Sequence, residues 1–158
     1  MKEAPFVVTV QGPRDCGKST LIRSLVEKYT RHKLQETVGT VSVRVSKTAR
    51  ISFIECPSDI AGMVDVAKVT DLALLVMDAS VGFEMETFEF LNILQHHGFP
   101  ACMGVLTRLD HYKENKQQRK LKKRMKKRFW KEVGDGCKLF YLSGLARESA
   151  KYPLYKKH

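Results

Sequence analysis

The chain has 158 residues, of which 43% are hydrophobic, and its 28 Lys or Arg against 17 Asp or Glu give a net charge of +11. This length suits one domain with its own core and excludes two large domains. Recurring apolar residues exclude a disordered tail. No apolar run approaches the ~20 residues that cross a bilayer, and we expect no membrane segment. The four cysteines at positions 16, 56, 102 and 137 form no C-x-x-C pair, which argues against zinc or disulfides and favours a reducing compartment.

The predicted elements alternate along the chain between strands and helices. β-branched or continuous apolar runs, bounded by turn residues, predict strands at 6–10, 41–45, 51–54, 72–77, 101–106 and 138–142. Apolar residues at helical spacing predict helices at 18–30, 60–69, 85–97 and 113–132. The second and third strands follow each other closely and are expected to form a hairpin. The alternation as a whole predicts an α/β domain with a mostly parallel sheet.

The residues between the first strand and the first helix match the phosphate-binding pattern G-x-x-x-x-G-K-[ST]. They are Gly12, Pro13, Arg14, Asp15, Cys16, Gly17, Lys18 and Ser19, followed by Thr20. The glycines let the backbone curl so that successive N–H groups point at phosphate oxygens, and the following helix adds the positive end of its dipole. Lys18 is expected to approach the β- and γ-phosphates, and the Ser19 hydroxyl to bind Mg²⁺. The sequence therefore predicts a site for a nucleoside triphosphate.

A second motif follows the fifth predicted strand, where guanine-specific proteins carry N-K-x-D. Here the residues are Thr107, Arg108, Leu109 and Asp110. Asp110 is expected to accept hydrogen bonds from the ring N–H and amino group of guanine, which adenine does not offer. Thr107 loses an amide contact to the base, whereas the stem of Arg108 could still cover the ring face. The alternative for Asp110 is a cap on the next segment. After the last strand, contacts to the base edge are expected from Ser143, Gly144 and Leu145.

Together these residues resemble a translation-factor-type GTPase, whose phosphate loop reads G-H-V-D-x-G-K-[ST]. The stretches 83–98, 128–133 and 138–144 are more specific and resemble the BMS-type GTPases of eukaryotic ribosome biogenesis. Related TSR-type proteins lack a working phosphate loop, so Lys18 and Ser19 favour the BMS branch. The resemblance implies one three-layer GTPase domain over 1–158 with a six-stranded sheet, belonging to a longer protein. In agreement, the residues after 145 are too short and polar for the expected closing helix.

The resemblance also implies a function: a GTP-binding and slowly GTP-hydrolysing switch in small-subunit assembly and 18S rRNA processing. It implies GTP or GDP with Mg²⁺ as ligands, the nucleolus as location, and pre-ribosomal RNA and small-subunit processome proteins as partners of a monomeric domain. Asp15 matches the translation-factor aspartate and implies a K⁺ site. Two alternatives stay open: a GTP-binding module without turnover, and a P-loop ATPase or kinase, because Thr107 and Arg108 depart from N-K-x-D.

The switch segments depart from the translation-factor pattern D-x-P-G-H, which is replaced by Glu55-Cys56-Pro57-Ser58-Asp59. Glu55 is expected to hold Mg²⁺ through a water. Asp59 takes the position of the catalytic histidine, beside a triphosphate of like charge, which predicts slow hydrolysis. A rival register, D-x-x-G over 59–62, is disfavoured because a helix is predicted from Ile60 onward. Among Thr37, Thr40 and Ser42, we expect Thr40 to cap Mg²⁺.

The positive charge is concentrated between residues 113 and 132, where eleven Lys or Arg stand against two glutamates. Leu121, Met125 and Phe129 recur at i, i+4 and i+8 and predict one buried stripe, too thin for membrane insertion. Like charges at this spacing repel, and an RNA backbone would relieve the repulsion through counterion release. A solvated surface helix is the alternative. The residues expected to touch RNA or an acidic partner are Lys120, Lys122, Lys123, Lys126 and Lys127.

Two further residues, Cys16 and Trp130, are expected to have structural and not catalytic or base-stacking roles. Cys16 lies beside phosphate-binding amides that favour a lowered pKa, but the motif places no base next to it, and we expect no catalytic thiol. Trp130 is expected to anchor the basic helix by packing and not to stack on bases.

Overall fold

The computed structural model describes residues 4–35 and 39–142. The strands are β1 (Phe6–Gln11), β2 (Thr40–Arg44), β3 (Arg50–Glu55), β4 (Leu72–Asp78), β5 (Ala101–Thr107) and β6 (Leu139–Tyr141). The helices are α1 (Lys18–Thr30), α2 (Ile60–Ala67), α3 (Met85–His96) and α4 (Asn115–Glu132), with a 3₁₀ turn η1 (Leu109–His111). Every predicted element is present, although α2 ends before residue 69 and α4 begins after residue 113.

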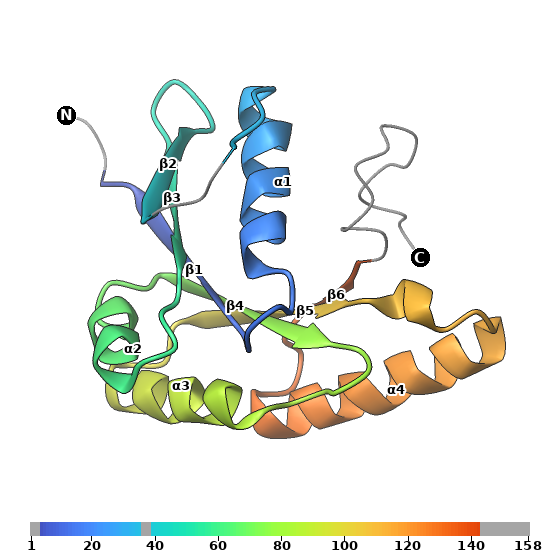
Figure 1. Ribbon diagram of the computed structural model, residues 1–158. Coiled ribbons are helices and arrows are strands. Elements are labelled where there is room, and N and C mark those ends of the chain that lie inside the picture. Colours follow the sequence, from blue (N-terminus) through green and yellow to red (C-terminus); the bar gives the residue numbers. More distant parts are fainter. Residues whose placement is uncertain (1–3, 36–38, 143–158) are drawn as a thin grey trace.

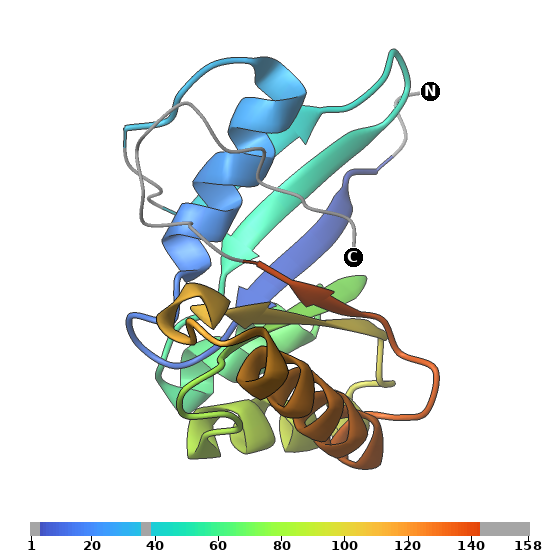
Figure 2. The same cartoon turned by 90° about the vertical axis from the view of Figure 1, so that its right-hand side faces the viewer.

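The six strands form one sheet in the order β2-β3-β1-β4-β5-β6. β2 runs antiparallel to β3, and the other neighbouring strands pair in parallel. α1 covers one face of the sheet, whereas α2, α3 and α4 cover the other (Figure 1; Figure 2). The predicted three-layer α/β fold with a mostly parallel six-stranded sheet is therefore confirmed.

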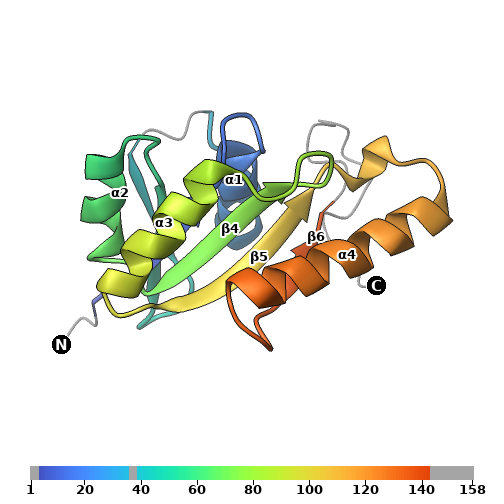
Figure 3. The ribbon, with the colours of Figure 1, turned by 90° about the horizontal axis from the view of Figure 1, so that it is seen from below.

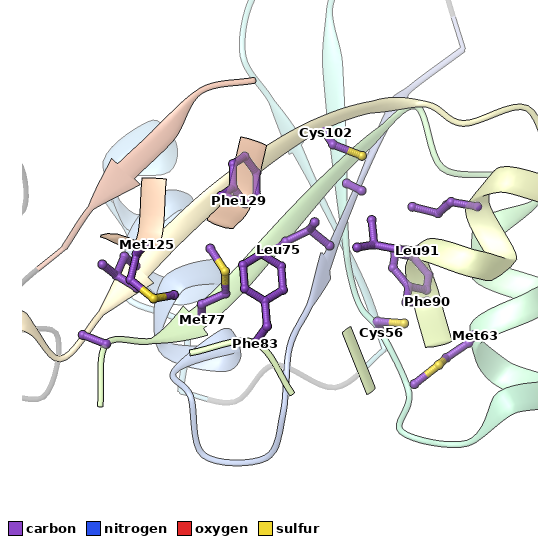
Figure 4. Packing of buried hydrophobic residues seen from close by; sticks show 14 of the residues in the cluster. Cys56, Met63, Leu75, Met77, Phe83, Phe90, Leu91, Cys102, Met125 and Phe129 are labelled. Atoms are coloured by element: carbon purple, nitrogen blue, oxygen red, sulfur yellow. The ribbon is translucent and has the colours of Figure 1, made fainter. Parts of the chain in front are cut away.

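The layers enclose two hydrophobic cores because β4 is buried on both faces. Leu74 and Val76 point into the core beneath α1, and the alternate residues Leu75 and Met77 point into the core beneath α2, α3 and α4. This alternation explains why the strand reads as a continuous apolar run. Figure 4 shows the second core, where Phe83, Met125 and Phe129 gather beside Leu75 and Met77 of β4.

α4 is attached to the sheet through the predicted stripe. Leu121, Met125 and Phe129 are only 6%, 3% and 0% exposed. Phe129 approaches β5 where the strand has Gly104, at which an added Cβ would lie 2.8 Å from a Phe129 ring carbon and 2.5 Å from Leu139 Cδ1. The predicted stripe is confirmed, and it leaves the rest of the helix surface outside the core. Within the described part of the chain, no helix has the length and apolar character needed to cross a membrane.

Candidate nucleotide-binding site

The predicted site residues meet at the carboxyl edge of the parallel strands. The phosphate loop follows β1, Glu55 ends β3, Asp78 ends β4 and Thr107 ends β5. The strand register aligns these ends, since Val10 pairs with Glu55 and Asp78 pairs with Thr107. Ligands of open α/β sheets bind outside this edge. Residues far apart in the sequence thus come together because parallel strands all end on the same side.

The phosphate loop has the backbone geometry of an anion cradle. Asp15 and Gly17 adopt left-handed conformations with φ of 59° and 102°, which turn successive N–H groups toward one concave side. At Gly12 a Cβ would lie 2.4 Å from the carbonyl oxygen of Val76, so only glycine fits. α1 begins at Lys18, and the Lys18 ammonium donates to the carbonyl oxygens of Gly12 (2.7 Å) and Pro13 (2.8 Å). The cation is therefore held against the loop that would cradle phosphates.

The two residues expected to hold Mg²⁺, Ser19 directly and Glu55 through a water, are in contact with each other. The Ser19 hydroxyl donates to Glu55 Oε2 at 2.8 Å, although the residues are 36 positions apart. This donor set fits Mg²⁺, which usually takes one or two protein oxygens and fills its other positions with phosphates and waters. Thr40 is the exposed first residue of β2 and pairs with Ile54. The hydroxyl of Ser42 is already bonded to that of Ser52 at 2.7 Å, which leaves Thr40 the better placed candidate of the two.

Asp59 caps the N-terminus of α2. It is the N-cap of α2, with an extended backbone, and its Oδ2 accepts the N–H of Gly62 at 2.8 Å. α2 begins at Ile60, which confirms the predicted helix on whose account the D-x-x-G register was disfavoured. An N-cap aspartate satisfies helix N–H groups that otherwise have no partner. The carboxylate expected beside the attacking water thus already serves as a cap, and its catalytic role stays a prediction.

A pocket of about 170 Å³ lies between the phosphate loop and the end of β5. Its lining consists of Asp15, Cys16, Gly17, Thr20, Thr107, Arg108, Asp110 and His111. Asp110 belongs to η1 and is exposed at the rim of this pocket. The structure therefore brings the phosphate loop and the residues of the predicted guanine motif to one cavity. Other predicted site residues, Thr37, Ser143, Gly144 and Leu145, lie outside the described residues.

Thr107 ties the phosphate loop to the sheet. Its side chain is buried, and its hydroxyl is 2.9 Å from the Cys16 carbonyl oxygen and 3.2 Å from that of Met77. The hydroxyl has one proton and is therefore shared between these two acceptors. Thr107, which stands where N-K-x-D has asparagine, thus holds the phosphate loop at Cys16.

Arg108 is held by a carboxylate that sequence reasoning missed. One amino group of Arg108 lies 2.7 Å from Asp78 Oδ2, and the other donates to the Asp15 carbonyl oxygen. Asp78 is only 4% exposed and also accepts from the Ser80 N–H (2.8 Å) and hydroxyl (2.6 Å). Burial acts to raise the pKa of Asp78, but the Ser80 hydrogen bonds and the Arg108 charge outweigh it and hold the pKa below its usual value. A polar residue ending an otherwise apolar strand was the available signal.

The expectation of a lowered pKa for Cys16 is wrong. Burial raises the pKa of this thiol to about 11, even though the Lys18 charge and backbone N–H groups act to lower it. Cys56, which is also buried, has its pKa raised to about 12. Both thiols therefore stay protonated at neutral pH, and the conclusion that Cys16 is not a nucleophile stands on burial.

Comparison with known proteins identifies the family. Residues 7–143 match the family described as "Tsr1, G-like domain". The chain belongs to this family. This G-like domain is 58% identical over 145 residues to the human "Ribosome biogenesis protein BMS1 homolog", a match that covers 92% of the chain and 11% of that protein. It is 52% identical over 149 residues to "Ribosome biogenesis protein bms1" of Schizosaccharomyces pombe, covering 94% of the chain and 13% of that protein.

The predicted resemblance to BMS-type proteins is thereby confirmed, and the chain spans about a tenth of the length of these relatives. Among solved structures, the domain is similar to translation elongation factor SelB from Methanococcus maripaludis in complex with the GTP analogue GPPNHP. The TM-score is 0.67 at 23% identity, covering 90% of this chain and 30% of that one. At this identity the likeness shows the fold alone, which this domain shares with the translation elongation factor SelB.

Proposed function

We propose that this chain is a guanine-nucleotide-binding domain that hydrolyses GTP slowly and serves a longer protein of ribosome biogenesis. The observation that carries the proposal is the cavity between the phosphate loop and Asp110, with Ser19 and Glu55 in contact at the loop. The names of the curated relatives support the biological setting, and the GTP analogue bound by SelB supports the ligand. Within this setting we place the domain in small-subunit assembly and 18S rRNA processing in the nucleolus, among pre-ribosomal RNA and processome proteins.

In this proposal, different residues of the chain bind the phosphates, the Mg²⁺ ion and the guanine base. The loop N–H groups and the Lys18 ammonium neutralise phosphate charge, and Asp110 selects guanine because it can accept from both donors on that edge of the base. Mg²⁺, held through Ser19 and Glu55, would neutralise the phosphate oxygens. Phosphoryl transfer depends mainly on positioning and charge stabilisation. Hydrolysis is slow in this proposal because the Asp59 carboxylate caps α2 and would stand beside like charge.

Guanine selectivity is tested by competition against a fluorescent GTP analogue. GTP and GDP should displace it, and ATP should not. Asp110→Asn removes a charged acceptor and presents an amide donor to the base. The affinity for GTP should therefore fall by about 10- to 100-fold. The affinity for xanthosine triphosphate should rise, because xanthine carries an oxygen where guanine carries its amino group. Asp135→Asn, an equal charge change in the exposed loop after α4, is the control. Equal competition by ATP would instead favour the ATPase or kinase alternative.

A GTP-binding module without turnover is the second candidate, and the capping bond of Asp59 favours it. Single-turnover assays of bound GTP, with and without pre-ribosome partners, separate the two. Asp59→His restores the translation-factor residue and should accelerate hydrolysis if this side chain reaches the attacking water. GTP that remains intact after prolonged incubation in all these assays would establish the binding module. Fast turnover by the isolated chain would contradict the slow switch.

Two smaller parts of the proposal have direct tests. The K⁺ site implied by Asp15 predicts that hydrolysis depends on K⁺ and not on Na⁺. The domain is expected to be monomeric in isolation, which light scattering on a size-exclusion column measures. Neither result bears on guanine selectivity.

A further inference from the structure

α4 has two opposite surfaces. Its buried side holds Leu121, Met125 and Phe129 against the sheet. The opposite side carries five exposed lysines, which we call the lysine ridge: Lys116, Lys120, Lys123, Lys127 and Lys131. At 3.6 residues per turn, their spacings of four, three, four and four residues place them within a strip about 80° wide and about 22 Å long. Figure 3 shows α4 on the outer layer, alongside β5 and β6.

No ion pair compensates the ridge within the described residues. Glu114 and Glu132 stand at the two ends of α4, and residues 115–131 contain no acidic residue. Among residues 4–35 and 39–142, the ion pairs join Lys68 to Asp65 and Arg108 to Asp78, and none involves α4. Lysines at i and i+4 repel each other. The buried stripe holds the helix in place despite this repulsion, and a bound polyanion would remove it.

Aromatic rings beside α4 are already engaged. Lys122 lies 5.2 Å from the centre of the Tyr141 ring, and Lys126 lies 4.5 Å from the Trp130 ring, whose indole N–H donates to the Cys137 carbonyl oxygen at 2.9 Å. Arg128 similarly lies over Phe83, a ring that is only 8% exposed. Single-stranded nucleic acids are bound through bases that stack on free aromatic faces. These rings instead hold cations of α4, so this surface offers mainly charge.

We propose that the lysine ridge binds the sugar-phosphate backbone of an RNA duplex. Lysine ammonium groups are point charges that suit phosphates and do not read base edges in the bidentate manner of arginine. Double-stranded RNA is recognised mainly through its shape and backbone, which a straight row of such charges fits. The choice of RNA over DNA rests on the proposed function in ribosome biogenesis. Lys122 and Lys126, expected to touch RNA from sequence, contribute less because they face the aromatic rings.

The test variant replaces Lys120, Lys123 and Lys127 by glutamine, and binding of a fluorescent 20-base-pair RNA duplex is followed by anisotropy across a series of KCl concentrations. Each phosphate contact contributes about 0.9 to the slope of log K against log salt in B-form DNA. We therefore expect the slope to fall by about 2 to 3 and the affinity at low salt to fall by more than 10-fold. The loss should be the same for duplexes of different sequence.

The matched control removes three exposed lysines elsewhere: Lys33, Lys47 and Lys68. It should keep a near-normal slope, because it changes net charge equally without touching the ridge. Circular dichroism and GTP-analogue affinity should be unchanged in both variants, so a failure of RNA binding is distinguishable from a failure of the nucleotide site. Equal weakening by both variants would overturn the inference. So would stronger binding of single-stranded RNA, or of a poly-glutamate peptide at matched charge, which would make the ridge a surface for an acidic protein.

Discussion

The ion pair between the buried Asp78 and the partly exposed Arg108 gives the sharpest test of how the site is held together. Asp78→Asn keeps the shape of the side chain, and its remaining oxygen can still accept the two Ser80 hydrogen bonds. The variant loses the negative charge that lies 2.7 Å from the Arg108 guanidinium. At that position the amide NH₂ of the asparagine would face an N–H of Arg108, and two donors cannot form a hydrogen bond. The substitution therefore isolates the charged contact.

The magnitude follows from the exposure of the two side chains. Hydrogen bonds to charged groups contribute about 1.5–3 kcal/mol. The Asp78 side chain is 5% exposed and that of Arg108 is 41% exposed, so water can solvate the guanidinium in the variant and the lower end applies. We expect the free energy of unfolding to fall by about 1.5 kcal/mol. With a urea slope of about 2 kcal/mol/M, the midpoint should fall by about 0.7 M.

The control is Asp65→Asn, which breaks the exposed Lys68–Asp65 pair, 3.1 Å long with 53% and 77% exposed side chains. Such surface pairs contribute about 0–0.5 kcal/mol.

The loss of stability caused by Asp78→Asn should also depend on pH. Because the pKa of Asp78 is lowered below its usual 3.8 in the folded chain, its contribution is present above pH 4 and is lost as the pH falls through the lowered value. Equal shifts of the urea midpoint in Asp78→Asn and Asp65→Asn would refute the reasoning. So would a difference in unfolding free energy between the unsubstituted chain and Asp78→Asn that does not change with pH.

The remaining predictions concern the core and the buried thiols. Phe129→Ala should lower the free energy of unfolding by about 3–5 kcal/mol, because it removes a fully buried ring. Phe140→Ala, at a ring that is 42% exposed, should cost less than about 1 kcal/mol in the same urea titration. Iodoacetamide at pH 8 should modify the half-buried Cys137 before Cys16, whose pKa is about 11. Rapid labelling of Cys16, read by peptide mass spectrometry, would contradict the burial argument.

Much of the fold could be predicted because its signals are local. The phosphate loop is eight consecutive residues between a strand and a helix, and the stripe of α4 follows from 3.6-residue spacing. The N-cap of α2 was also available from sequence, since Asp59 immediately precedes a predicted helix and aspartate is favoured there. The resemblance to translation factors also places Asp59 beside the reacting water, so the sequence offers two roles for this residue and the structure shows the cap.

The sequence by itself determined the α/β class, the phosphate loop and the crowding of cations on one helix, because each depends on residues a few positions apart. Tertiary structure alone decided how Thr107 and Arg108 are used. Their partners Cys16, Met77, Asp78 and Asp15 lie 91, 30, 30 and 93 positions away and come near only when β1, β4 and β5 end at the same edge. Burial, which raises the pKa of Cys16 against its neighbouring charges, is likewise a property of the packed layers.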